Sequence, residues 1–142
     1  MNNENIFPVI TLYQPWATWI MRGWKDIETR THDRFACLNT RTILIHAAMT
    51  TDGDAINNPY LTREQIKFNP DEMVNGCILG SVHVYDFQKL NPEHSKRALI
   101  ECDTKRFGLF LQAINKFDTP IPVKGNMGIW YYDLENKIKV KK

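Results

Sequence analysis

The sequence predicts a mainly β domain of the α+β class, a small closed or nearly closed barrel of five to seven short strands with two or three short flanking helices. Runs rich in Val, Ile, Phe and Tyr recur along the chain, separated by clusters of Gly, Pro, Asn and Asp. Helix signals are confined to short segments. The 142 residues suffice for one buried core, so we expect a single domain over residues 1–142, with its core at about 6–133 and a basic tail at 134–142.

The first predicted strand covers residues 6–12, which are β-rich and bounded by asparagine. Pro8 cannot donate a ladder hydrogen bond, so we expect the strand to begin at Val9 or to lie at a sheet edge. Pro15 then fits the first position of a short helix, and Gly23 fits the left-handed residue just past its end. The helical face has i, i+3, i+4, i+7 spacing and consists of Trp16, Trp19, Ile20 and Gly23.

Residues 25–30 alternate in the manner of a strand. Ideal pleating places Lys25 on the face opposite to Glu28 and Arg30, so a turn or bulge at Lys25 is needed to bring its ammonium group to the other two charges. If that happens, Glu28 and Arg30 form either an ion pair that merely fixes a corner of the chain or part of a binding site.

Three tryptophans, Trp16, Trp19 and Trp24, stand within nine residues of one another and next to these charges. The ordinary interpretation is a helix-to-strand corner with solvated charges. Aromatic faces beside guanidinium and ammonium groups are also what a protein presents to a nucleobase and its phosphate. If the stretch is a nucleotide-binding site, Trp16 or Trp24 would stack on the base.

The remaining elements follow from the same signals. A capping box at Thr62 and Gln65 predicts a short helix to about Phe68, and Gly80 predicts a bulge or bend within its strand. The prolines at 120–122 predict an extended segment that is barred from central ladder pairing. The other predicted elements are strands at 42–48, 76–87, 107–114 and 129–132 and a helical turn at 91–98. The lysine-rich C-terminal tail is expected to be a frayed, solubilising end strand, with contact to phosphate as the alternative.

His46 lies near the end of the buried strand at 42–48, and two interpretations stay open for it. It is either a core histidine with its hydrogen bonds satisfied or a pocket residue near a barrel mouth, where it would bind a base edge or a carbonyl group. The irregular stretch at 49–75 is expected to shape one wall of the cleft, with Tyr60 and Arg63 as contributors.

The composition is that of a soluble globular protein, with 43% hydrophobic and 24% charged residues. No apolar run approaches the roughly 20 residues that a membrane helix needs, so we expect a cytoplasmic protein without membrane contact. The formal net charge is +2, but 4 of the 18 basic residues lie in the last six positions, which leaves 14 basic against 16 acidic residues for the rest. Any nucleic-acid contact is therefore expected to be local.

The cysteines and histidines predict neither a metal nor another cofactor. Cys37, Cys77 and Cys102 are widely separated and lack C-x-x-C spacing, and the four histidines show no ligand pairing such as H-x-x-x-H. We expect reduced thiols, with Cys77 as a small core residue.

Residues 23–30 read Gly-x-Lys-x-x-Glu-x-Arg, which resembles the G-x-K-x-x-E-x-R signature of ASCH domains. The sequence before it, Gln14-Pro15-Trp16-Ala17, resembles the Q-P-W/Y-A helix start common in that family. Further blocks at 43–47, 76–82 and 120–130 resemble its L-I-H-A, G-x-I-x-G-x-V and P-I-P-x-K-G-x-x-G-L-W strands. Together these blocks span residues 11–131 in the family's order.

The resemblance implies a PUA-like barrel in which the signature lines a cleft between the barrel and the first helix. It also implies single-stranded RNA or a modified nucleoside or nucleotide as the ligand. The branch of the family that hydrolyses N4-acetylcytidine carries a threonine where this chain has Glu28, beside the equivalent of Lys25. The candidate ligand-binding residues are Gln14, Trp16, Trp24, Lys25, Glu28, Arg30 and His46.

Three functions remain open from the sequence. In a binding module, Lys25 and Arg30 would hold phosphate or carbonyl oxygens and Glu28 would accept from a base amine. In a small amidohydrolase or ribonuclease, Lys25 and Glu28 would be the acid and base, with the lysine pKa lowered by burial and by Arg30. In a protein-interaction domain, the cleft would hold a protein partner.

Overall fold

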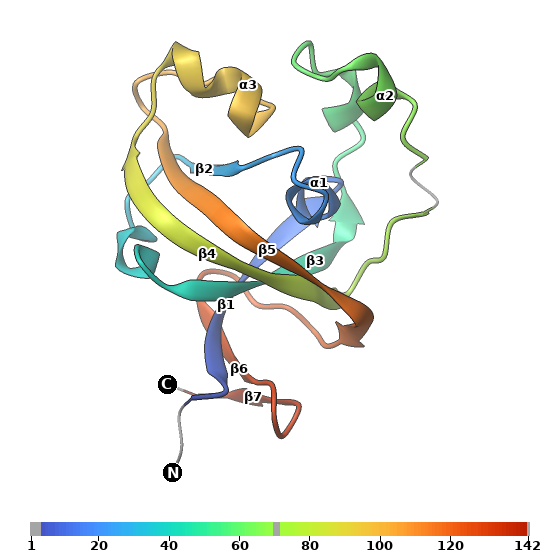
Figure 1. Cartoon of the computed structure of the whole chain (residues 1–142), viewed down its shortest axis with the longest axis vertical. Helices are drawn as coiled ribbons and strands as arrows, with labels where there is room; N and C mark the ends of the chain where they lie inside the picture. The colour runs from blue at the N-terminus through green and yellow to red at the C-terminus, as the bar shows by residue number, and fades with distance from the viewer. Residues whose placement is uncertain (1–3, 70–71, 142) are drawn as a thin grey trace.

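The computed structural model describes residues 4–69 and 72–141 (Figure 1). The strands are β1 (Ile6–Gln14), β2 (Ile27–Arg30), β3 (Thr42–Thr51), β4 (Cys77–Lys89), β5 (Phe107–Pro122), β6 (Trp130–Asp133) and β7 (Ile138–Val140). The α-helices are α1 (Trp16–Met21), α2 (Arg63–Ile66) and α3 (Ser95–Ala98), with short 3-10 turns at Ala36–Leu38, Ala55–Asn57 and Pro92–His94.

The described strands form one sheet in the order β2-β5-β4-β3-β1-β6-β7. Only β1 and β3 run parallel, while the other neighbours are antiparallel. Figure 1 shows the long β4 and β5 curving together across the molecule, with β6 and β7 at the end opposite to α2 and α3. The predicted fold class, a small barrel-like sheet of five to seven strands with few short helices, is confirmed.

The sheet is apolar on both faces where it curls. One face of β1, β3, β4 and β5 packs with α1 around residues such as Ile10, Ile45 and Val82. The other face carries Leu44 and Ile78, which pack with Trp130 and further aromatic residues of β6 and its surroundings. The alternating register of a strand separates these two sets of side chains.

Helix α1 is short, and its stability comes from packing rather than from its length. It buries Trp19, Ile20 and Met21, and burying an aliphatic side chain of this size contributes about 1.5–3 kcal/mol. Pro15 stands before the helix as its N-cap, not at the predicted first helical position. Gly23 has the predicted left-handed conformation, with φ of 76°, and turns the chain toward β2.

Two predictions about prolines were wrong in part. β1 begins at Ile6 rather than Val9, but Pro8 pairs only with β6, because the ladder with β3 starts at Val9. β5 is one strand of 16 residues, and Ile121 and Pro122 pair with β4. Since β2 pairs only with the start of β5, the far end of β5 is open on that side, where proline removes no ladder bond.

The C-terminal stretch forms an end strand, as predicted, but this strand is paired and not frayed. β7 pairs with β6 from Tyr131 to Asp133, so part of the basic tail extends the sheet. The short helix after the capping box of Thr62 and Gln65 is present as predicted, and Cys77 is buried. None of the helices in the described ranges is long and apolar enough to cross a membrane.

Gly80 lies at the predicted irregularity, where the register of β4 shifts against β5 next to it. A Cβ atom there would collide with the carbonyl oxygen of Asn115 and would lie 3.0 Å from Cα of Lys116. Both atoms belong to the backbone of β5 and cannot move without distorting the ladder. The close approach of the two strands therefore requires glycine at this position.

We predict that Gly80→Ala lowers the free energy of unfolding by about 1–3 kcal/mol, because the methyl group overpacks the contact between β4 and β5. Urea unfolding followed by circular dichroism measures the change. Gly53→Ala is the matched control, because a Cβ atom at Gly53 meets nothing within 4 Å. Equal stability of the two variants would contradict the prediction.

Candidate functional site

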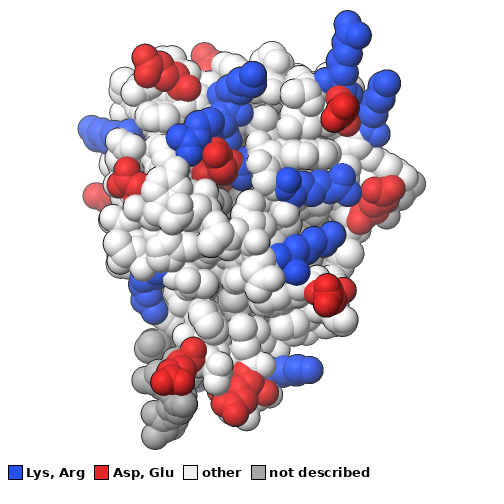
Figure 2. All heavy atoms as spheres, in the orientation of Figure 1, with Lys and Arg blue, Asp and Glu red and all other residues white. Residues whose placement is uncertain are grey.

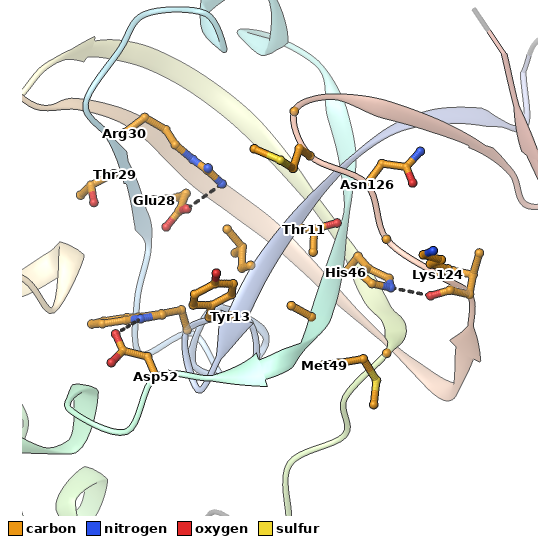
Figure 3. Close-up of a pocket in the computed structure, with 18 of the residues that line it drawn as sticks. Thr11, Tyr13, Glu28, Thr29, Arg30, His46, Met49, Asp52, Lys124 and Asn126 are labelled. Atoms are coloured by element: carbon orange, nitrogen blue, oxygen red, sulfur yellow. Dashed lines mark hydrogen bonds and ion pairs between the residues drawn. The ribbon is translucent and has the colours of Figure 1, made fainter.

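A cavity of about 980 Å³ opens on one side of the sheet. Its walls come from β1, the start of α1, the segment around β2, the end of β3 and the loop between β5 and β6. Figure 3 shows Glu28 and Arg30 on one side of it and His46 with Lys124 on the other, with Tyr13 between them. These segments are far apart in the sequence, so the fold alone assembles the cavity.

Three charged side chains meet at one wall of the cavity. One carboxylate oxygen of Glu28 lies 3.1 Å from Nη2 of Arg30, and the other lies 3.7 Å from Nζ of Lys25. Because β2 begins only at Ile27, Lys25 lies in the turn that its approach to Glu28 requires. The Lys25 ammonium also donates a hydrogen bond to the carbonyl oxygen of Ala98, the last residue of α3.

Burial governs the acid–base behaviour of Lys25, which is only 1% exposed. Loss of hydration lowers the pKa of Lys25 below its ordinary value of 10.5, and attraction to Glu28 opposes this shift. Repulsion from Arg106 lowers the pKa further, which is the effect that the sequence assigned to Arg30. The lysine therefore releases its proton more readily than an exposed lysine does.

Aromatic rings surround this charged wall. The ammonium of Lys25 lies 5.0 Å from the ring centroid of Trp16, and the guanidinium of Arg30 lies 4.6 Å from that of Phe35. The indole N–H of Trp16 donates to Asp52 over 3.1 Å, which fixes the ring beside the cavity. Tyr13 lines the cavity and is 55% exposed, so its ring is open to a ligand.

His46 combines both interpretations that the sequence left open. It is 1% exposed and donates from Nε2 to the carbonyl oxygen of Val123 over 2.7 Å, yet it also lines the cavity. A Cβ atom on Gly125 would lie 2.7 Å from Nδ1 of His46, so the loop can cover the ring only with glycine there. Within the described residues, Nδ1 is buried without a hydrogen-bond partner.

A neutral imidazole follows from this environment. Burial lowers the pKa of His46 below its ordinary value of 6.5, the bond to Val123 opposes the shift, and repulsion from Lys139 adds to it. Protonation would place a second N–H at Nδ1, where no acceptor within the described ranges receives it.

Two predicted ligand-binding residues lie away from the cavity. Gln14 is fully buried, donates to the carbonyl oxygen of Val74 over 2.8 Å and accepts from the amide of Thr18 over 3.0 Å. It joins β1, α1 and the 49–75 stretch. Trp24 packs edge-on against Phe68, with ring centroids 5.7 Å apart. Both side chains therefore have structural contacts instead of a place in the cavity wall.

The two residues expected to shape the cleft from the irregular stretch also lie outside the main cavity. Tyr60 lines a smaller hollow of about 280 Å³ that adjoins it, and Arg63 lies in the first turn of α2. In their place, Asp52 of the same stretch reaches the main cavity.

Sequence reasoning missed several lining residues. Thr11 and Tyr13 come from the first strand, where hydrophobic periodicity says nothing about a binding role. The loop between β5 and β6 supplies Lys124 and Asn126, and its only sequence signal was the resemblance of residues 120–130 to a family block. No group of three or more potential metal ligands occurs in the part of the chain that the structure describes.

The curled sheet, with a charged cavity beside its first helix, defines the class of this protein as a small, mainly β domain with a barrel-like sheet. Within that class the chain belongs to the ASCH domain family, whose sequence model matches residues 10–131.

A solved structure agrees with this fold. The crystal structure of ASCH from Zymomonas mobilis superposes with a TM-score of 0.52 at 14% sequence identity, covering 81% of this chain and 72% of that one. Two point variants of that protein give TM-scores of 0.49 and 0.48 at 15% and 14% identity, with 81% and 82% of this chain and 74% and 73% of theirs covered. No curated protein matches the chain.

We predict that acid destabilises the protein through His46. Its folded pKa lies below 6.5, so between those two values the unfolded chain binds more protons than the folded protein. Stability is therefore lost as the pH falls from 6.5 toward the folded pKa, by up to about 1.4 kcal/mol per pH unit. Urea unfolding of the wild type and His46→Gln measures this effect.

His46→Gln retains a side-chain N–H for Val123 but cannot titrate. Subtracting its free energy of unfolding at each pH from that of the wild type removes the contribution of other groups. The difference in stability between the two proteins should change with pH in that window. A difference that is constant between about pH 4 and pH 7 would show that His46 is not the group responsible.

Proposed function

We propose that this domain binds single-stranded RNA, or a modified nucleoside or nucleotide, with one unstacked base in the cavity. The observation that carries the proposal is the cluster of Lys25, Glu28 and Arg30 at the wall of an open cavity beside Trp16 and Tyr13. Membership of the ASCH domain family supports it. The free thiols of Cys37, Cys77 and Cys102 support a reducing, cytoplasmic setting.

The charge of the cluster suits a ligand that is rich in oxygen acceptors. When all three groups are ionised, two cations face one carboxylate and the cluster is net positive. Taking such ions out of water costs several kcal/mol each, so a buried ion pair is a poor way to stabilise a corner of the chain. The side chain of Arg30 is 23% exposed, which leaves its planar donor groups within reach of a phosphate or carbonyl oxygen.

The remaining lining residues suit a base. Glu28, whose side chain is 8% exposed, offers a carboxylate to an exocyclic amine, and the ring of Tyr13 offers a face for stacking. A volume of about 980 Å³ stands at the upper end of the range for small-molecule pockets, about 300–1,000 Å³, and accommodates a nucleotide. Duplex RNA hides its base edges, so the expected target is a single strand.

The alternative interpretation is that the charged cluster only fixes a corner of the chain. It keeps some support, because Lys25 links the segment before β2 to α3 through Ala98. It does not account for the open cavity next to the cluster or for an exposed tyrosine at its mouth. A protein partner in the cleft is a further alternative. It predicts no affinity for nucleic acid even at low salt, where phosphate contacts are strongest.

We predict that Tyr13→Ala weakens binding of single-stranded RNA by about 1–3 kcal/mol, the usual value of one base stacked on an aromatic ring. Because Tyr13 is 55% exposed, its removal leaves the core intact. Fluorescence anisotropy measures the loss with a labelled RNA of about eight nucleotides, a length within the range of about 4–16 nucleotides that single-strand-binding OB folds occupy.

Tyr85→Ala is the matched control, because Tyr85 is 39% exposed on β4 and does not line the cavity. Thermal stabilisation by nucleosides, including N4-acetylcytidine, tests the same cavity without a phosphate backbone. Absence of binding to RNA and to every nucleoside at low salt would overturn the proposed function.

One observation favours hydrolysis as a second candidate function. Lys25 has a lowered pKa and lies 3.7 Å from Glu28, so an amine that releases its proton more readily than an exposed lysine stands beside a carboxylate at the cavity wall. Such a pair can take a proton from an attacking water and return it to a leaving amine or alkoxide. Against this, the Lys25 ammonium already donates to Ala98, and Glu28 occupies the position of the threonine found in N4-acetylcytidine hydrolases of the family.

For the binding module we predict no release of acetate from N4-acetylcytidine and no cleavage of single-stranded RNA. Chromatography of the products after incubation with stoichiometric protein measures both. Lys25→Met, which fills similar volume without a titrating group, is the control for any trace of activity. Turnover by the wild type that is absent in Lys25→Met, with ligand binding retained, would establish the hydrolase instead.

A further inference from the structure

The mouth of the cavity is basic on one side. Residues 123–128, here called the covering loop, contribute the exposed Lys124 to the cavity wall. Lys139 of β7 reaches the same loop, where it donates to Oδ1 of Asn126 over 3.0 Å and lies 5.0 Å from the ring centroid of Trp130. No acidic side chain in the described ranges forms an ion pair with either lysine.

The other side of the mouth is acidic. Asp52 lines both the main cavity and the smaller hollow next to it, and Asp54 and Glu101 line that hollow as well. Figure 3 shows Asp52 and Lys124 on opposite sides of the main cavity. A phosphate group at the smaller hollow would be repelled by these carboxylates. Salt would screen this repulsion only partly at separations below the Debye length, which is about 8 Å at physiological ionic strength.

The mouth also carries large exposed apolar side chains. Met127 is 99% exposed, Met49 is 78% exposed and Tyr13 is 55% exposed, and all three line the cavity. Isolated exposed apolar residues are ordinary, but three around one opening indicate a binding surface. Flat rings and flexible thioethers suit bases next to the one in the cavity.

Among the described residues, the face of the molecule displayed in Figure 2 carries no basic patch that would compete with this site. Figure 2 shows basic and acidic side chains interspersed over the face displayed, in agreement with a formal net charge of only +2. On this face a phosphate backbone has no broad basic surface to follow, so local differences in charge decide its path there.

We infer that an RNA strand with one base in the cavity leaves it over the covering loop, with its phosphates beside Lys124 and Lys139, and does not cross the acidic side at Asp54 and Glu101. This inference rests on the proposed function. It adds the path that the strand takes over the protein surface and the residues that contact its phosphates. The ligand class is accordingly an oligonucleotide rather than a free nucleoside alone. β7, at the C-terminal end of the described chain, becomes part of the binding surface.

Charge reversal at the two lysines tests the path. Lys124→Glu changes a side chain with no ion pair within the described ranges, and Lys124→Glu with Lys139→Glu removes both contacts. Anisotropy with a labelled mixed-sequence RNA of about eight nucleotides is measured over a salt series. The slope of log affinity against log salt should fall in magnitude by about 1.4 in the double variant, about 0.7 for each lost phosphate contact.

The control variant has the same change in net charge as the double variant, but at two lysines away from the cavity. Lys67→Glu with Lys89→Glu reverses two exposed lysines that line neither cavity, so its salt slope should stay at the wild-type value. Asp54→Lys with Glu101→Lys should not weaken RNA binding. Thermal unfolding of each variant shows that it is folded.

The outcomes separate this inference from the proposed function. A larger loss of affinity for RNA than for nucleosides in the Lys124 variants, with the smaller slope, supports the path. Wild-type binding of RNA with the same slope in the double variant and the control overturns the path and leaves the proposed function standing. Binding of nucleosides but not of RNA also overturns it, and failure of both ligands to bind overturns both proposals.

Discussion

Glu28 is the residue on which the arrangement of the site depends. Its carboxylate holds Lys25 and Arg30 at once, and its backbone pairs with β5 in the sheet. Lys25 in turn holds the carbonyl oxygen of Ala98 in α3, and Arg30 packs over a ring of the following loop. Without the carboxylate, Lys25 would be left buried with no opposite charge, and breaking a buried pair in this way costs about 3–5 kcal/mol.

The cavity exists because segments from both ends of the chain meet beside this cluster. β1 delivers Tyr13 to its mouth, and the covering loop closes the far side over His46. Gly125 permits the loop to approach the imidazole closely, and Lys139 ties Asn126 to β7. The terminal strand thus holds in place a loop that lines the cavity, a role that its composition of alternating lysines does not suggest.

Individual residues explain how much of this could be predicted. The bulge at Gly80 and the helix stop at Gly23 were predicted, because glycine leaves a local signal at such positions. The sequence also showed that a turn at Lys25 would bring its ammonium group to Glu28, because the two residues are only three positions apart. Gln14 and Trp24 stand beside the same cluster in the sequence, but hydrogen bonding and ring packing with the 49–75 stretch draw both away from the cavity. No local pattern reports such distant partners.

The sequence alone determined the fold class, the family blocks and the charged cluster, because these follow from alternation, turn residues and contacts within a few positions. Only the tertiary structure decided which aromatic rings face the cavity, that Pro120 and Pro122 lie within a paired strand, and that Asp52 and Lys124 occupy opposite sides of one opening. The physical reason is that these features depend on which distant segments pack together, and such contacts are set by the shape and register of the whole sheet.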